Sequence, residues 1–247
     1  MKITVFQIIN FILIVLAGIL FIRYIWDVIV NPDYQPAGWK NARKKGKLPR
    51  VLLKLERSYP DKARFFNWWL QVERLKAWQV AGAFAELGVY KGESARIIHH
   101  MDPDRRFHLF DTFEGFRPDD LEAERGEAAT YSTNNFADTS IPTVVRFIEG
   151  NRNILIHAGY FPGSASEVFH ERFALVNIDA DLYNPTRAGL EFFYPRLSPG
   201  GVILVHDYNF KWEGVIEAVN DFCKTIPENP SLLPDRECTV IIIRNKF

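Results

Sequence analysis

Cysteine is scarce in this sequence, and several common catalytic motifs are missing. The 247 residues include two cysteines, Cys223 and Cys238, and no C-x-x-C pair. This excludes a disulfide scaffold and a zinc module, and it fits a reducing compartment. There is no G-x-S-x-G stretch, which excludes the serine nucleophile of an α/β-hydrolase. Apolar residues, by contrast, make up 47% of the chain and aromatic residues 14%, enough for a large buried core.

A long uncharged run opens the chain. Ile3–Ile22 contains no ionisable side chain, and a helix needs about 20 apolar residues to cross ~30 Å of hydrocarbon. A cleaved signal peptide would have a shorter apolar stretch and a small-residue cleavage site, neither of which is evident before Arg23. We therefore expect residues 1–30 to be a single-pass transmembrane anchor.

Basic residues are concentrated directly after this run. The formal net charge is zero, yet residues 34–64 carry ten Lys and Arg against Glu56 and Asp61. Positive charge on this flank predicts that the following domain faces the cytoplasm. Residues 31–60 contain prolines and glycines at intervals and are expected to be a basic linker, whose charges are either solvated or in contact with anionic lipid. Nucleic acid is a poor candidate partner because the rest of the chain is acidic.

From residue 61 onward, helix-like and strand-like segments alternate. Residues 61–80 predict a helix with Asp61 at its N-cap. Short apolar runs, separated by helix-like segments, predict strands at residues 83–87, 105–111, 153–158, 173–179, 201–207 and 237–244. The alternation is typical of a doubly wound, mostly parallel sheet that binds ligands at the carboxyl ends of its strands. The expected fold is an α/β, Rossmann-like domain over 61–247.

The first expected strand runs into a glycine turn. Gly88 and Gly92 follow it, and a helix is expected from about Glu93. Such a turn directs backbone N–H groups towards a polar or anionic ligand. The next strand ends at Asp111, nineteen residues after Gly92, where a nucleotide-binding fold places an acid on the ribose hydroxyls. The pattern is not the dinucleotide G-x-G-x-x-G, so it disfavours an NAD oxidoreductase and predicts an adenosyl ligand.

Acidic and imidazole side chains follow two later strands. Asp179 and Asp181 come after one of them, and His206 and Asp207 come after the next. If these strands are neighbours, Asp179, His206 and Asp207 converge at the carboxyl edge of the sheet, beside the cofactor. Carboxylates and an imidazole there could hold a divalent cation. Taken singly, each acid could equally cap a helix.

The glycine turn carries a first family resemblance. E-x-G-x-x-x-G followed by a strand-end acid resembles the class I S-adenosylmethionine-dependent methyltransferases, and ELGVYKGESAR is similar to a stretch of the catechol O-methyltransferases. This resemblance implies a sheet that ends in a C-terminal antiparallel strand. It also implies a cofactor site made by Glu86, Gly88, Tyr90, Gly92 and Ser94 at the methionine end, Asp111 at the ribose, and Gly159.

Four further stretches, FDTFEGF, IDADLY, LEFFYPRLSPGG and VHDY, resemble the macrocin O-methyltransferase (TylF/MycF-type) family over about residues 80–243. The resemblance implies methylation of a sugar hydroxyl with S-adenosylmethionine and Mg²⁺, a metal ligand at Asp179 and a base at Asp181. The family has an Asp-Asp pair where this chain has His206 and Asp207. We therefore expect one of three outcomes: a softer ion such as Mn²⁺ or Zn²⁺ held by Asp179, His206 and Asp207, His206 acting as a base, or a site without metal.

Several alternatives stay open at this point. The acceptor could be a phenol or a lipid headgroup, which a membrane anchor would suit, or the chain could bind the cofactor without catalysis. Residues 112–140 could form a lid or a solvated excursion. We expect a small-molecule or saccharide acceptor, a membrane contact through the N-terminal helix and no nucleic acid, and we leave a homo-oligomer open.

Overall fold

The computed structural model describes residues 4–26, 29, 35–122 and 124–245. The chain divides into two compact units, Met1–Lys47 and Leu48–Phe247. The first consists of two helices, and the second contains the sheet and the remaining helices.

The uncharged run at the start of the chain forms one helix, α1 (Val5–Ile25). Thr4 caps it through a reciprocal capping box with Gln7, so both side chains satisfy backbone groups of the first turn. Its length and mean hydropathy of 2.8 are sufficient to cross a membrane, although a signal sequence meets the same criteria. Other parts of the expected anchor, residues 1–3, 27–28 and 30, lie outside the described residues.

The described part of the expected linker, residues 35–60, contains two helices. α2 (Ala37–Lys44) lies in the first unit, while α3 (Arg50–Ser58) belongs to the second unit and packs beside α5. Leu52 and Leu55, three residues apart, give α3 a buried side. Residues 31–34 lie outside the described part of the chain.

Prolines lie next to both ends of α3. Pro49 is the N-cap of α3, and Pro60 follows the end of the helix at Tyr59. Proline is compatible with both places, because it interrupts only the interior of a helix. The prolines therefore mark the limits of a short amphipathic helix rather than a linker.

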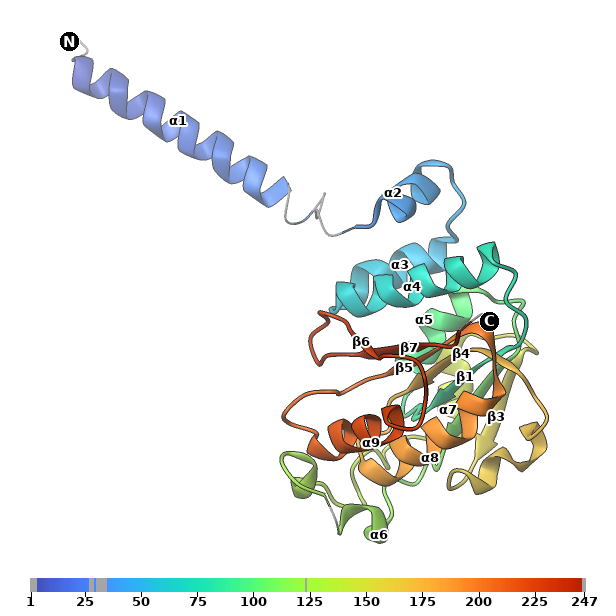
Figure 1. Ribbon diagram of the computed structural model, residues 1–247. Helices are drawn as coiled ribbons and strands as arrows, with labels where there is room; N and C mark the ends of the chain where they lie inside the picture. The colour runs from blue at the N-terminus through green and yellow to red at the C-terminus, as the bar shows by residue number, and fades with distance from the viewer. Residues whose placement is uncertain (1–3, 27–28, 30–34, 123, 246–247) are drawn as a thin grey trace. The chain divides into compact units, whose positions relative to one another are not determined.

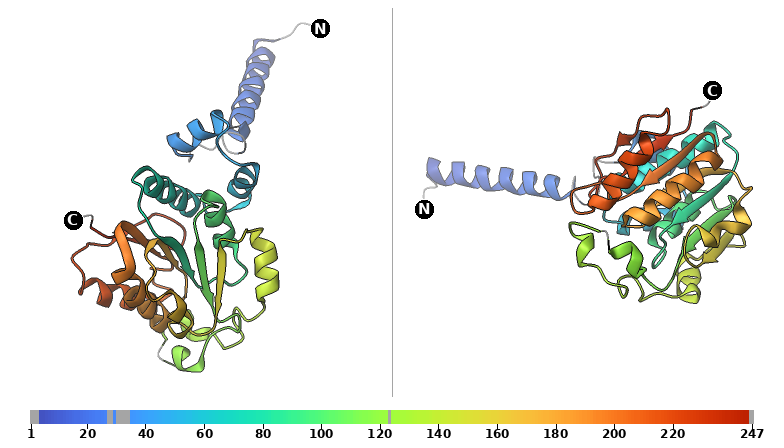
Figure 2. Two further views of the ribbon diagram at one scale, coloured as in Figure 1. Left: turned by 90° about the vertical axis from the view of Figure 1, so that its right-hand side faces the viewer. Right: turned by 60° about the horizontal axis from the view of Figure 1, so that its bottom comes forward.

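A seven-stranded sheet forms the centre of the second unit. Its order is β3-β2-β1-β4-β5-β7-β6, and Figure 2 shows these strands side by side. The strands are β1 (Ala83–Leu87), β2 (Phe107–Asp111), β3 (Ile154–Ala158), β4 (Phe173–Ile178), β5 (Leu197–Val205), β6 (Ser231–Leu232) and β7 (Val240–Ile243). The first five are parallel, whereas β7 pairs antiparallel with β5 and β6. The predicted α/β fold with a C-terminal antiparallel strand is confirmed.

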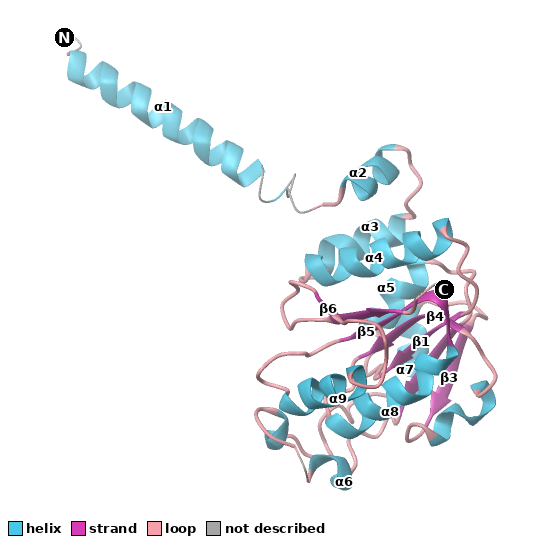
Figure 3. Cartoon of the chain, in the orientation of Figure 1, coloured by secondary structure: helices cyan, strands magenta, loops and turns pink. Residues whose placement is uncertain are grey.

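Helices cover both faces of the sheet (Figures 1 and 3). One layer contains α3, α4 (Lys62–Ala77), α5 (Glu93–Met101) and α7 (Ile141–Ile148), and the other contains α8 (Tyr183–Phe193) and α9 (Glu213–Cys223). The connections include α6 (Pro118–Leu121), η2 (Ala128–Thr130), η3 (Gly163–Val168) and η4 (Tyr194–Arg196). The predicted N-cap of α4 is confirmed, because the Asp61 carboxylate accepts a hydrogen bond from the backbone of Arg64.

The register of the sheet brings four strand ends to one level. Leu87 of β1 pairs with Phe110 of β2 and with Ile178 of β4, and Ile178 pairs with Val205 of β5. All four residues are buried and apolar, so a shift in register would move apolar side chains out of the core. The residues that follow these strands, which the sequence singled out, therefore lie at one edge of the sheet.

Candidate active site

A cavity of about 680 Å³ lies at the carboxyl ends of these strands. Its wall contains most of the residues expected from the sequence, from both the cofactor end and the reacting end. They are Gly88, Tyr90, Ser94, Asp111, Gly159, Asp179, Asp181, His206 and Asp207. Glu86 and Gly92 are not among its lining residues.

The backbone at Gly88 passes very close to the end of β4. Gly88 has φ of +87°, and a Cβ there would lie 1.9 Å from the carbonyl oxygen of Asp179. Only glycine fits this position, because any side chain would collide with the backbone and would also be strained at this φ. The glycine turn and the residues after β4 therefore form adjoining parts of the cavity wall.

Asp111 holds the glycine turn in place. Its Oδ2 accepts hydrogen bonds from the backbone N–H groups of Val89 and Tyr90 at 2.7 and 2.8 Å, and its Oδ1 accepts one from Phe113 at 2.7 Å. Each carboxylate oxygen can accept further bonds, so Asp111 can also bind a hydroxyl group that enters the cavity. The ribose contact proposed for it remains a prediction.

Gly92 and Glu86 have structural positions that differ from the expectation. Gly92 has φ of +83° and is the N-cap of α5, facing α7. Glu86 is fully buried and turned inward: its Oε1 accepts hydrogen bonds from the Ser94 hydroxyl and from Asn177, the latter at 2.8 Å. Burial raises the pKa of Glu86 to about 8. Both faces of its strand are buried, so the Glu86 side chain points into the protein interior. There it bonds to the Ser94 hydroxyl and positions this cavity-lining residue.

The raised pKa of Glu86 predicts a pH-dependent stability. Between about pH 4.5 and pH 8 the unfolded chain ionises this carboxyl while the folded chain keeps it protonated, so the free energy of unfolding falls as the pH rises through this window. Glu86→Gln retains the accepting oxygen and removes the ionisation. We expect it to raise the free energy of unfolding at pH 7 by up to about 3 kcal/mol, with little change at pH 4.5.

Urea unfolding of the full-length protein in detergent at pH 4.5, 6, 7 and 8, followed by tryptophan fluorescence, measures this difference. Glu114→Gln provides the matched control, since Glu114 is exposed. If the free energies of unfolding of Glu86→Gln and wild type change in parallel with pH, the buried carboxyl is ionised in the folded state. The raised pKa assigned to Glu86 is then wrong.

Residues 112–140 cover part of the cavity, and their far end is attached to the glycine turn. The Tyr90 hydroxyl donates to Asp138 at 2.8 Å, Lys91 pairs with the same carboxylate at 2.6 Å, and the Thr139 hydroxyl donates to the Tyr90 carbonyl at 2.7 Å. The Phe136 ring packs against the Tyr90 ring, with the two ring centres 5.0 Å apart. The arrangement is that of a lid in contact with the cavity rather than a solvated excursion.

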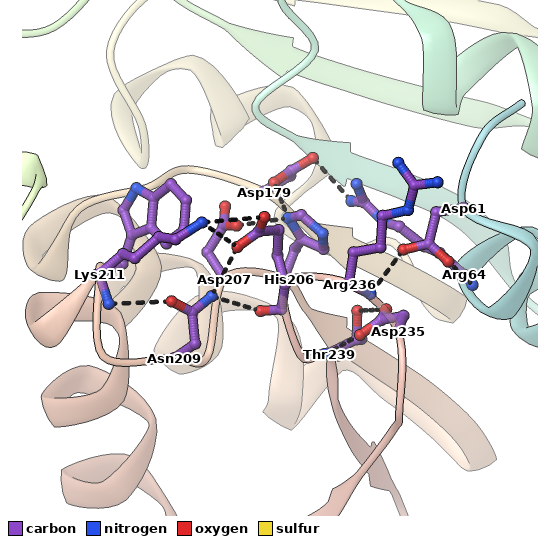
Figure 4. A network of polar contacts seen from close by, with 12 residues as sticks. Asp61, Arg64, Asp179, His206, Asp207, Asn209, Lys211, Asp235, Arg236 and Thr239 are labelled. Carbon is purple, nitrogen blue, oxygen red and sulfur yellow. Dashed lines mark hydrogen bonds and ion pairs between the residues drawn. The ribbon is translucent and has the colours of Figure 1, made fainter.

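The reacting end contains the expected cluster of acids and imidazole (Figure 4). His206 Nδ1 lies 3.0 Å from Asp179 Oδ1 and 2.9 Å from Asp207 Oδ1. Although it is buried between the two oxygens, Nδ1 makes a well-formed hydrogen bond with neither. Asp181 faces the same cavity and has φ of +60°.

Charge interactions within the cluster shift the pKa values in opposite directions. Burial alone would raise the pKa of Asp179 and lower that of His206, but ion pairing outweighs burial in both: it lowers the pKa of Asp179 and raises that of His206 to about 9. Burial and the neighbouring Asp207 and Asp179 raise the pKa of Asp181. In this state His206 carries a proton at neutral pH. The raised pKa of Asp181 likewise favours its protonated form, so the base role of either residue remains a prediction.

Arg64 is a component of the site that sequence reasoning missed. It lies in the first turn of α4, and its Nη2 lies 2.8 Å from Asp179 Oδ2 in an ion pair (Figure 4). Tyr59, just before α4, also lines the cavity. The sequence analysis predicted the helix and its N-cap but assigned no role to this arginine. The available signal was the charge itself, since an arginine beside buried aromatic residues requires a partner.

The start of α4 is fixed by a second polar network. The Asp61 carboxylate accepts hydrogen bonds from the backbone of Arg64 at 3.0 Å and from the backbone of Arg236 at 2.8 Å. Arg236 belongs to the loop before β7, where Asp235 accepts from the Thr239 backbone at 2.6 Å. Figure 4 shows this network beside the acid cluster. Asp61 therefore links the turn that carries Arg64 to the loop before β7, which is far away in the sequence.

The cluster has the composition and spacing of a candidate site for a divalent cation. One ligand atom each from Asp179, His206 and Asp207 lies within 4.8 Å of the others. The His206 Nδ1 atom without a well-formed hydrogen bond points between the two carboxylates, as a ligand atom would. Two carboxylates and an imidazole suit Mn²⁺ or Zn²⁺ as well as Mg²⁺.

Comparison with known proteins gives relatives of one chemical class. The chain is 29% identical over 163 residues to the 8-demethyl-8-(2,3-dimethoxy-alpha-L-rhamnosyl)-tetracenomycin-C 4'-O-methyltransferase of Streptomyces olivaceus, covering 61% of each chain. It is 32% identical over 142 residues to the mycinamicin III 3''-O-methyltransferase of Micromonospora griseorubida, covering 52% of this chain and 56% of the relative. The chain thus spans about six tenths of the length of these curated relatives.

Solved structures agree on the fold. The O-methyltransferase NovP superposes with a TM-score of 0.64 at 24% identity, over 74% of this chain and 80% of that chain. The calicheamicin methyltransferase CalS11 superposes with a TM-score of 0.56 at 21% identity, over 85% and 93%. At these identities the likeness shows the fold alone.

A family model described as macrocin-O-methyltransferase (TylF) matches residues 54–229. The matched range includes the glycine turn, Asp111, the acid cluster and Arg64. With the sheet order and the composition of the cavity, this match shows that the chain belongs to the macrocin-O-methyltransferase (TylF) family.

Proposed function

We propose that this protein is an S-adenosylmethionine-dependent O-methyltransferase that methylates a sugar hydroxyl. The observation that carries the proposal is that one cavity is lined both by the glycine turn with Asp111 and by Asp179, Asp181, His206 and Asp207. The name of the Streptomyces olivaceus relative supports a saccharide acceptor, since it describes an O-methyltransferase of a rhamnosyl-bearing product.

The reaction requires the chain to align two reactants and to accept one proton. S-adenosylmethionine carries the methyl group on a positively charged sulfonium sulfur. After transfer, the rest of the molecule leaves as a neutral thioether. The acceptor oxygen forms a bond with the methyl carbon while the carbon–sulfur bond breaks. The electron pair of the carbon–sulfur bond goes to sulfur. The hydroxyl proton goes to a base on the chain. Because no covalent intermediate with the chain is needed, positioning of the two reactants in the cavity accounts for much of the rate.

Asp181 is the proposed base. It lies at the same edge as the acid cluster, and its raised pKa makes its ionised form a stronger base than an ordinary aspartate. His206 and Arg64 are cationic neighbours that balance the carboxylates of Asp179 and Asp207. Of the lid residues, Tyr131 is held by Trp212 Nε1 at 3.3 Å, and its pKa is raised by burial and by Asp181, so it lies near this base.

A divalent cation fits among the ligand atoms of Asp179, His206 and Asp207. When bound, such an ion lowers the pKa of a coordinated hydroxyl group. His206 would have to release its Nδ1 proton to act as a ligand, so the ion and the proton compete for the same position.

An acceptor panel tests the proposed function. Full-length protein in detergent is incubated with S-adenosylmethionine and one acceptor at a time, which is a deoxysugar glycoside, catechol or a phospholipid headgroup analogue. Each reaction is run with and without EDTA. We expect S-adenosylhomocysteine to form only with a saccharide. Formation with catechol or with a headgroup would assign another acceptor class, and binding of S-adenosylhomocysteine without turnover on any acceptor would favour a non-catalytic scaffold.

We also propose that α1 anchors the protein in a membrane with the second unit in the cytoplasm. The supporting features are the apolar length of α1 and the basic residues that follow it, including the exposed Arg50, Lys54 and Arg57 of α3. Carbonate extraction of membranes should leave the protein in the pellet, and externally added protease should leave the second unit intact in sealed cells. A soluble, shortened product would identify residues 4–25 as a signal sequence instead.

A further inference from the structure

Arg64 presents a buried positive charge to the cavity. Its side chain is 8% exposed and lines the cavity wall. The guanidinium lies 4.7 Å from the centre of the Trp68 ring, and Nη2 pairs with Asp179 Oδ2 at 2.8 Å. A guanidinium has five N–H donors, and within the described part of the chain its Nε has no hydrogen-bond partner. The ion pair with Asp179 therefore leaves the Nε donor of this nearly buried guanidinium without a partner among the described residues.

The surroundings of Arg64 face the methionine end of the expected cofactor site. Asp179, its partner, lies against Gly88 of the glycine turn. Ser94, in the first turn of the nine-residue helix α5, and Tyr59 line the same cavity. The N-terminus of α5 carries partial positive charge, so this wall combines a helix N-terminus with a nearly unexposed guanidinium.

The two hydroxyl groups that the family resemblance places at the methionine end have other partners here. The Tyr90 hydroxyl donates a hydrogen bond to Asp138 at 2.8 Å, and the Ser94 hydroxyl donates one to Glu86. Each hydroxyl has one proton to donate, so neither can also donate to an incoming carboxylate. Arg64 is a charged donor at this end of the cavity that can.

We infer that Arg64 binds the α-carboxylate of the methionine end of S-adenosylmethionine. This inference rests on the proposed function, because it assigns a further binding residue to the same cofactor. Guanidinium and carboxylate match in geometry and charge, and the carboxylate supplies acceptors for the donors that Asp179 leaves free. Arg64 then contacts the cofactor through one edge and the Asp179 side chain through another, so one side chain fixes the cofactor relative to the reacting end.

The experiment compares two ligands that differ only in the carboxylate. Titration calorimetry measures binding of S-adenosylhomocysteine and of its decarboxylated analogue, S-adenosyl-3-thiopropylamine, to the full-length protein in detergent. In wild type we expect the carboxylate to strengthen binding by about 10- to 100-fold. In Arg64→Gln this advantage should fall to less than about threefold, with binding of the analogue nearly unchanged.

Two further variants separate charge recognition from folding. Arg64→Lys retains the charge and should recover part of the preference for the carboxylate, and Arg74→Gln removes another α4 arginine, which bonds to the Gly200 carbonyl outside the cavity. Unchanged analogue binding in Arg64→Gln shows that the adenosyl site is folded.

The results distinguish this inference from the proposed function. Wild type that binds neither ligand contradicts the proposed function itself. Wild type that prefers S-adenosylhomocysteine, together with an Arg64→Gln variant that keeps the full preference, overturns only the assignment of Arg64. If Arg64→Gln changes the KM of an acidic acceptor and leaves both cofactor ligands unaffected, the carboxylate bound by Arg64 belongs to the acceptor, and the inference is wrong.

Discussion

Replacing Asp207 with asparagine is expected to lower kcat by roughly two to four orders of magnitude, while the Kd of S-adenosylhomocysteine changes by less than about threefold. Asp207 Oδ1 lies 2.9 Å from His206 Nδ1, and the side chain is 4% exposed. Asparagine removes the negative charge and keeps the shape. It also tolerates the left-handed backbone at this position, where φ is +63°, so a loss of activity reports on charge rather than on backbone strain.

Initial rates of S-adenosylhomocysteine formation and calorimetric titration, both on the full-length protein, give kcat and Kd separately. Asp221→Asn is the matched control, because Asp221 of α9 pairs with Lys224 and does not line the cavity. Asp207→Asn with wild-type turnover would contradict the role assigned to the acid cluster. A parallel loss of cofactor affinity would instead move Asp207 into the cofactor site.

Asp179→Asn is a less direct test of the same cluster. Asp179 pairs with the buried Arg64, and removing one partner of a buried ion pair leaves an uncompensated charge that costs about 3–5 kcal/mol. We expect this variant to lose both activity and stability. In Asp207→Asn, by contrast, His206 keeps Asp179 as a second charged partner, so this variant separates chemistry from folding more clearly.

Gly88→Ala is expected to abolish binding of S-adenosylhomocysteine and to lower the free energy of unfolding by at least about 3 kcal/mol. The added Cβ would lie 1.9 Å from the carbonyl oxygen of Asp179, which is backbone and cannot rotate away. Relief requires β1 and β4 to separate at their carboxyl ends, where Leu87 and Ile178 pair. Such a movement would deform the wall of the cavity.

Gly46→Ala isolates the conformational part of this effect. Gly46 has φ of +65°, similar in sign to Gly88, but a Cβ there would meet no atom within 4 Å. We expect it to cost about 1 kcal/mol and to leave cofactor binding unchanged. Urea unfolding and calorimetry on both variants provide the comparison, and equal losses in the two would show that the contact with Asp179 is unimportant.

The convergence of Asp179, His206 and Asp207 could be predicted because it follows from strand order alone. The strands that precede these residues are buried and apolar, and neighbouring parallel strands end at the same edge of a sheet. Asp111 after β2 follows the same logic. The sequence predicts these positions well because each of them depends on a local pattern and on one topological rule.

Arg64, Glu86 and α3 could not be predicted in this way. Whether Arg64 points to solvent or into the cavity depends on how α4 packs on the sheet, which no local pattern specifies. Glu86 faces inward because Ser94 and Asn177 are on that side, and these are tertiary contacts. The prolines around α3 were interpreted as breaks, whereas the buried side of that helix becomes evident only when its neighbour α5 is in place.

The hydrogen bond from the Arg236 backbone to Asp61 joins residues 175 positions apart in the chain. Closing so long a loop comes late, because its entropic cost must be met by contacts that form first. During synthesis α4 leaves the ribosome well before the segment that secures its first turn. The hydrogen bond that secures this turn can form only after residue 236 has been synthesised, so translation itself delays the final shape of the pocket until the loop before β7 is available.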